Sequence, residues 1–138
     1  MSIGGWNLQK AVYAKLSADT ALIALLGDQP RIHDDVPAGT ILPYVQIGDS
    51  TEADWSTASD LGSEHQLTIH AWSRGGGRME ARAILSAIHG ALHDAPLAVE
   101  NNRLVNMRFV LSQVLRETDG ETYHGIARYR AVTEPISI

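Results

Sequence analysis

The first part of the chain has hydrophobic residues at helical spacing. Between Trp6 and Leu16, the residues Leu8, Ala11 and Val12 fall on one side of a helix together with Leu16. The opposite side is polar, which is typical of a helix that packs on a core. The pattern therefore predicts an amphipathic helix over Trp6 to Leu16.

A second, shorter helix is expected after it. Ser17 and Asp19 are candidate N-caps, and Gly27 is well placed to end the helix. Residues 28–43 contain three prolines and predict an ordered loop. The apolar residues of this second helix are Leu22, Leu25 and Leu26.

From Tyr44 the hydrophobic period changes to two, which indicates strands. Val45 and Ile47 point to one side, and residues 66–72 alternate in the same way. Between these strands lies the acidic stretch GDSTEADWSTASDLGSE at 48–64. The stretch is long for a hairpin loop, so either both strands extend into it or it is a functional loop.

A helix is predicted over Arg78 to His93, and Pro96 prevents its continuation. The segment Gly75–Gly77 before it lies between a strand and a helix, where phosphates bind in some proteins. It lacks the Lys-Ser/Thr of a P-loop and the G-x-G-x-x-G spacing, so we interpret it as a flexible connection. The apolar face of this helix consists of Ala81, Ile84, Leu85, Ile88 and Leu92.

The C-terminal third is predicted to be β-structure. A short strand is expected at Leu97 to Val99, followed by a turn at 100–103. Asp119-Gly120 is a strong hairpin signal, and the last strand is expected from about Tyr123 to Val132. The strand before that hairpin has an apparent apolar face of Val105, Met107, Phe109 and Leu111.

This order of elements predicts an α+β fold. The strands come in antiparallel clusters, so we expect an antiparallel sheet with the helices packed on one face and one long extended hairpin or loop. Residues 1–138 are expected to form one domain. An uncovered sheet face that mixes apolar and basic groups suggests contact with another protein. The side chains expected on that face are His70, Trp72, Arg108, Arg128 and Arg130.

Composition narrows the possible functions. The chain has 138 residues, a net charge of −5 and no cysteine, so a disulfide framework, a thiolate zinc site and a cysteine nucleophile are excluded. No apolar run approaches the ~20 residues of a membrane-spanning helix, and no secretory signal is evident, so we expect a cytoplasmic setting without membrane contact. Residues 41–70 carry five acidic residues and no Lys or Arg, and there is no basic stripe of the kind that nucleic-acid binders show.

The sequence contains one candidate metal site. His89 and His93 are four residues apart on the predicted helix, and Asp94 could be a third ligand. The sequence HGALH lacks the general base of H-E-x-x-H, and no G-x-S-x-G occurs. We therefore predict no catalytic site, no metal and no cofactor, and a small metal-dependent enzyme using these histidines stays as the less favoured alternative.

Four long stretches carry a family resemblance. They are RIHDDVPAGTILPYVQIGD at 31–49, DWSTASDLGSEHQLTIHAWSR at 54–74, GRMEARAILSAIHGALHD at 77–94 and LVNMRFVLSQVLRETDGETYHGIARYRAVTEP at 104–135. In these stretches the chain resembles the tail-completion, or tail-terminator, family of long-tailed bacteriophages, especially the versions in gene transfer agents. The likeness is collinear over nearly the whole chain, and no single motif carries it.

The resemblance implies a structural virion protein and no reaction. Such a protein forms a homo-oligomeric, hexameric ring at the head-proximal end of the tail tube, ends tube polymerisation and joins the tail to head-completion proteins. DNA passes through the lumen without sequence-specific binding. The implied location is the tail-neck region of the virion, with assembly in the bacterial host cytoplasm. A tail-tube subunit or a neck adaptor is the alternative within the same setting.

An acidic segment and an arginine-bearing strand face suggest how two copies could contact each other. Rings are built from contacts between two different surfaces, and surfaces of opposite charge help to set the register. We expect an acidic segment of one protomer, or of a tail-tube neighbour, to dock near an arginine face; alternatively the acidic segment lines the lumen and repels DNA. Trp55 in the acidic segment is a candidate anchor, since Trp is enriched in binding hot spots. The predicted interface residues are Asp49, Glu52, Asp54, Trp55, Asp60, Trp72, Arg108, Arg128 and Arg130.

Overall fold

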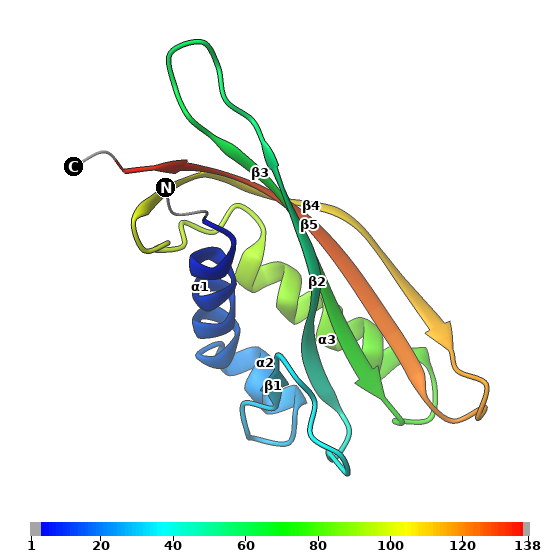
Figure 1. Ribbon diagram of the computed structural model, residues 1–138. Coiled ribbons are helices and arrows are strands. Elements are labelled where there is room, and N and C mark those ends of the chain that lie inside the picture. Colours follow the sequence, from blue (N-terminus) through cyan, green and yellow to red (C-terminus); the bar gives the residue numbers. More distant parts are fainter. Residues whose placement is uncertain (1–3, 137–138) are drawn as a thin grey trace.

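The computed structural model describes residues 4–136. Three helices cover one face of a twisted five-stranded sheet (Figure 1), so the predicted α+β fold is confirmed. The strand order is β1-β2-β3-β5-β4, and every pairing is antiparallel except that of β1 with β2. The helices are α1 (Gly5–Ser17), α2 (Thr20–Leu25) and α3 (Arg78–Leu92); the strands are β1 (Ile32–His33), β2 (Tyr44–Asp54), β3 (Ser63–Ser73), β4 (Asn102–Arg116) and β5 (Tyr123–Pro135).

The helix boundaries follow the predicted caps. The Asp19 carboxylate accepts a hydrogen bond from the backbone N–H of Leu22 at 2.9 Å and so caps α2. Gly27 follows α2 with a φ of 80°, a left-handed conformation that glycine adopts without strain.

No helix in the described residues is both long and apolar enough to cross a membrane.

The core lies between the helical layer and the inner face of the sheet. Tyr129 of β5 is fully buried in it, and so is Met107 of β4, which lies opposite Ala131 of β5. The other fully buried large side chains include Leu8 and Leu16 of α1, Leu22 of α2, Ile69 of β3, and Ile84, Ile88 and Leu92 of α3. These are the residues whose spacing predicted the helices and strands.

Two predictions about strands are wrong. Leu97 to Val99 forms no strand; it is a connection in which Val99 is buried, so its apolar residues anchor a loop rather than pair with a neighbour. The predicted loop 28–43 contains the short strand β1, whose Ile32 pairs with Val45 in parallel, and the sheet is therefore mixed rather than wholly antiparallel.

The predicted apolar face of β4 is also interrupted. The pairing of β4 with β5 shifts register between Leu104 and Asn106 and again between Phe109 and Leu111. Each shift inserts one extra residue and exchanges the two faces of the strand beyond it. Leu111 is therefore opposite Arg128 on the outer face and not beside Met107 in the core.

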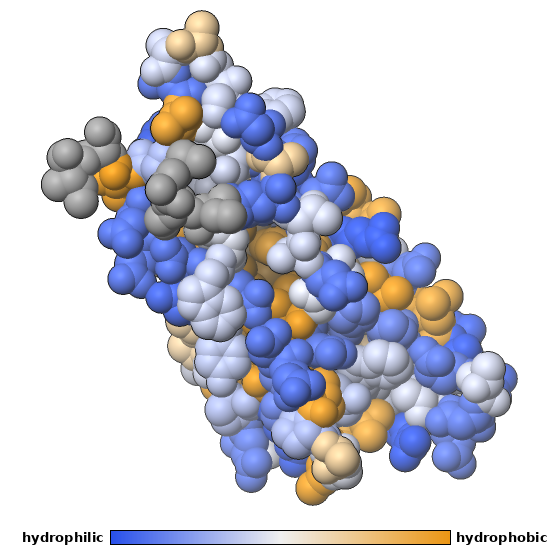
Figure 2. Space-filling model, in the orientation of Figure 1, coloured by the Kyte–Doolittle hydropathy of each residue, from blue (hydrophilic) through white to orange (hydrophobic). Residues whose placement is uncertain are grey.

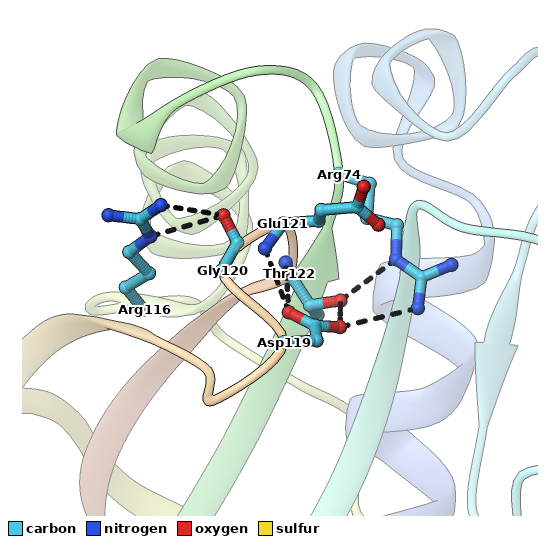
Figure 3. A network of polar contacts seen from close by, with 6 residues as sticks. All are labelled: Arg74, Arg116, Asp119, Gly120, Glu121 and Thr122. Carbon is cyan, nitrogen blue, oxygen red and sulfur yellow. Dashed lines mark hydrogen bonds and ion pairs between the residues drawn. The ribbon is translucent and has the colours of Figure 1, made fainter.

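The β4–β5 hairpin ends in a locked turn (Figure 3). The Asp119 carboxylate accepts hydrogen bonds from the hydroxyl and N–H of Thr122 and from the N–H of Glu121, which hold its pKa well below the ordinary range. Arg74, at the end of β3, donates to Thr122, and Arg116 donates to the carbonyl of Gly120. The predicted Asp-Gly turn is present, and these contacts fix its position relative to β3.

Candidate assembly surfaces

The acidic stretch forms the end of an extended hairpin. β2 and β3 remain paired as far as Asp54 and Ser63, and the hairpin projects past the helical layer (Figure 1). At its tip the N–H of Trp55 donates to the carbonyl of Gly62, and the N–H of Thr57 donates to that of Asp60, each at 2.8 Å. Of the two readings that the sequence left open, the strands do extend into the acidic stretch.

Glu52 is used inside the protomer. Its two carboxylate oxygens accept hydrogen bonds from the N–H groups of Gly4 and Gly5, at 3.2 and 3.1 Å. These N–H groups begin α1, whose N-cap position is a glycine with no side chain to satisfy them. A carboxylate there also interacts favourably with the helix dipole. Glu52 thus joins the base of the hairpin to α1, a role that its place in an acidic run did not reveal.

Apart from Glu64, which is paired with Arg130, the other acidic residues of the hairpin face solvent. Asp49 lies where the pairing of β2 with β3 is irregular, and Asp60 lies in the tip. Asp54 accepts a hydrogen bond from the Ser56 hydroxyl at 2.6 Å. These three residues give the hairpin an accessible negative surface.

Trp55 contacts its own protomer. Its side chain is 54% exposed, and the guanidinium carbon of Arg130 lies 5.0 Å from the centroid of its ring, within cation–π range. Arg130 also donates from Nε to the Glu64 carboxylate. The remaining indole surface is free for a partner.

The three arginines predicted on the open sheet face do lie there, in neighbouring strands β4 and β5. Arg130 is paired with Glu64, and the Nε of Arg108 lies 3.3 Å from the Asp94 carboxylate. Within residues 4–136, Arg128 forms no ion pair and is exposed. Arg128 is therefore the member of this group with its charge most available to another molecule.

Trp72 belongs to an aromatic cluster on the same face. Its ring stacks on that of His124 with centroids 3.8 Å apart, and His70 Nδ1 lies 2.7 Å from His124 Nε2. Burial lowers the pKa of both histidines, and the neighbouring His124 lowers that of His70 further. A Cβ on Gly48 would lie 2.5 Å from His70 Nε2, so the ring can occupy this place only because residue 48 is glycine. Trp72 is half-buried in this stack, and less exposed than its position on an open sheet face suggested.

The histidines of α3 have local partners. The rings of His89 and His93 stack with centroids 4.7 Å apart, and His93 Nδ1 accepts the backbone N–H of Phe109. His93 Nε2 lies 3.3 Å from the Asp94 carboxylate. In the part of the chain that the structure describes, no three His, Asp or Glu side chains are grouped so as to hold a metal ion.

Sequence reasoning missed one further surface. Trp6 and Tyr13 of α1 are 62% and 45% exposed, although aromatic residues in an amphipathic helix usually face the core. Their seven-residue separation places them on one side of the helix, which is the only signal that could have found them. They lie outside the stripe formed by the buried Leu8, Val12 and Leu16.

Comparison with known proteins identifies the family. The family model for tail completion protein gp17 matches residues 10–134. Tail completion protein gp17 of Bacillus phage SPP1 is 33% identical over 123 residues, covering 89% of each chain. A chain in the structure of the virion of a native gene transfer agent particle matches with a TM-score of 0.87 and 30% identity, over 97% of this chain and 99% of that one.

The solved structure of the SPP1 gp17 protein itself matches with a TM-score of 0.64 and 30% identity, over 99% of this chain and 97% of that one. Sequence and structure thus agree over nearly the full length, as the resemblance predicted. The chain belongs to the tail completion protein gp17 family.

Proposed function

We propose that this protein is a structural component of a phage-like virion that forms a homo-oligomeric, hexameric ring at the head-proximal end of the tail tube. There it ends polymerisation of the tube protein and joins the tail to head-completion proteins. The observation that carries the proposal is the match with a chain of a gene transfer agent virion over 97% of this chain. We infer that the ring assembles in the host cytoplasm.

The surfaces described above support an assembly role. The projecting hairpin, with Asp49, Asp54, Asp60 and Trp55, offers an acidic and aromatic contact that reaches beyond the helical layer. The open sheet face carries Arg128 and apolar side chains with no helix over them. Surfaces of this kind suit contacts with tube and neck proteins above and below a ring.

The proposal includes no reaction and no sequence-specific contact with DNA. DNA would pass through the lumen. A metal-dependent enzyme is disfavoured because His93 Nδ1 already accepts the N–H of Phe109, which leaves only Nε2 of this ring for a metal. Replacing His89 and His93 together by Ala should leave particle assembly intact.

The direct test is removal of the gene from a strain that produces the particles, followed by negative-stain electron microscopy. Loss of a terminator should leave tails of uncontrolled length and heads without tails, and the wild-type gene should restore both. Loss of a tube subunit would instead leave no tails at all. Loss of a neck adaptor would leave free tails of normal length. Unchanged particles would contradict every version of the proposal.

A second variant tests the hairpin separately. Replacing residues 55–62 by a short Asn-Gly turn keeps the β2–β3 pairing and removes the tip. We expect this variant to fold, as judged by circular dichroism, and to fail to join heads to tails. The matched control is substitution of the exposed Met79 on α3, which lies outside these surfaces and should have no effect.

A further inference from the structure

Exposed hydrophobic side chains gather at the two opposite edges of the sheet. β1 forms one edge, with α1 packed beside it, and β4 forms the other. In Figure 2 hydrophobic side chains follow the margin that Figure 1 draws as β4. Large exposed side chains are Trp6 and Tyr13 at the α1 edge, and Val110, Leu111 and Leu115 at the β4 edge.

The α1 edge contains a groove. It has a volume of about 620 Å³ and lies between α1 and the segment that begins with β1. Trp6 and Tyr13 line one side, Asp34 and Asp35 line the other, and the buried Ile32 contributes to the floor. The groove thus combines an apolar interior with the two aspartates on one side; Lys10, which also lines it, is paired with Glu100.

The β4 edge has the complementary character. β4 contains three arginines and no acidic residue; Arg103 and Arg108 are paired with Glu134 and Asp94, whereas Arg116, which donates to the carbonyl of Gly120, forms no ion pair within residues 4–136. The register shift beyond Phe109 turns Leu111 and Leu115 to the outer face, where they pair with Arg128 and His124 of β5. Within residues 4–136, β4 has no neighbouring strand on one side; Met107 and Phe109 bond there to Asp94 and His93, and the edge beyond Phe109 is accessible to another molecule. An apolar edge that carries Arg116, unpaired in the described part of the chain, therefore lies opposite an apolar groove that carries Asp34 and Asp35.

We propose that the β4 edge of one copy packs into the α1 groove of the next copy. The proposal rests on the ring proposed above and assigns its lateral contact. The two surfaces are different and lie at opposite edges of one sheet, which is what a head-to-tail contact requires; if the rotation between copies closes, the product is a ring. Leu111 and its neighbours enter the groove beside Trp6 and Tyr13, and Asp34 and Asp35 meet Arg116 at the end of β4. The projecting hairpin then stays free for the proteins above or below the ring.

Cysteine cross-linking tests this pairing directly, because the natural chain contains no cysteine. Tyr13→Cys and Leu111→Cys replace exposed side chains on the two surfaces. With a short bismaleimide, a 1:1 mixture of the two single variants should give one cross-linked dimer and nothing larger. The double variant should give a ladder that ends at the copy number of the ring. Each single variant alone should give no cross-link.

The control is a mixture of Met79→Cys with Leu111→Cys, which should not react although Met79 is 86% exposed. The same reactions are run on purified protein and on particles assembled from the variants. Cross-linking of a single variant with itself would show a two-fold contact and overturn the proposal. Rings at the tail end without the Tyr13–Leu111 cross-link would overturn it while leaving the proposed function intact. Dimers from the mixture without any ring would instead overturn the proposed function and support the pairing.

Discussion

Arg130 lies over the indole ring of Trp55, with its guanidinium carbon 5.0 Å from the ring centroid, and also donates to the Glu64 carboxylate. One arginine of β5 thereby holds two residues of the projecting hairpin. The sequence suggested that the acidic segment and the arginine face would meet between protomers. Arg130, one residue of that face, instead contacts the acidic segment of its own protomer. The hairpin therefore presents its free surface in a fixed direction.

Trp55→Ala should weaken assembly and change stability little. The side chain is 54% exposed, and an exposed cation–π contact contributes only about 0.5–1 kcal/mol. Thermal unfolding and the fraction of tailed particles measure the two effects. The control is Leu61→Ala, since Leu61 is a similarly exposed residue in the same loop. A large fall in melting temperature would assign Trp55 to the folded core instead.

Glu52→Ala should destabilise the protein by about 1–2 kcal/mol, because it leaves the N–H groups of Gly4 and Gly5 without their acceptor. Glu52→Gln keeps one acceptor oxygen and should lose less. Urea unfolding gives the free energies. Asp49→Ala is the matched control, an exposed carboxylate on the same strand that should change stability by less than about 0.5 kcal/mol. Equal effects at the two positions would contradict the capping role.

Local signals in the sequence predicted most of the helical layer. Asp19 caps α2 as expected, and the apolar face of α3 is buried as its spacing indicated. Such signals depend on neighbours within a few residues, so one sequence is enough to identify them. The hairpin turn at Asp119-Gly120 is of the same kind.

Features that depend on distant pairing could not be predicted. The two register shifts in β4 are defined only by its pairing with β5. The alternation of apolar and polar residues in β4 therefore predicted, wrongly, that Leu111 faces the core. Glu52 reaches residues 47 and 48 positions away, and nothing in an acidic run distinguishes it from Asp49 or Asp54. The candidate surfaces could be predicted only in part. The sequence shows segments of opposite charge, but it does not show which of these charges are paired within the protomer.

Met107 and Leu111 should respond very differently to truncation. Met107 is 1% exposed and Leu111 is 39% exposed, although both belong to the same apparent alternation. Met107→Ala should cost about 2–5 kcal/mol of unfolding free energy, and Leu111→Ala less than about 1 kcal/mol. Leu111→Ala should nevertheless reduce ring formation. Similar losses of stability would mean that β4 keeps one uninterrupted register.

The paired histidines predict a pH dependence. The pKa values of His70 and His124 are lowered in the folded protein and return to about 6.5 on unfolding. The unfolded state therefore takes up protons first, and the histidines destabilise the fold as pH falls below about 6.5. NMR titration should give midpoints below 6.5 for both rings. His124→Gln should raise the pKa of His70, on which Asp49 and Arg128 also act, whereas His65→Gln on the inner face should not.

Arg128 tests whether the acidic hairpin docks on the open sheet face of a neighbour. Arg108 and Arg130 have partners within the protomer, so reversing them would disturb the fold as well as any interface. Arg128→Glu changes an exposed residue without an ion pair among residues 4–136. If the hairpin docks there, this variant should assemble poorly, and Asp49→Arg with Asp54→Arg should restore part of the assembly. Each exposed ion pair contributes only ~0–1 kcal/mol, so the loss should be partial, and wild-type assembly should weaken from low to high salt. Assembly that tolerates both Arg128→Glu and high salt would contradict docking and favour an acidic segment that lines the lumen.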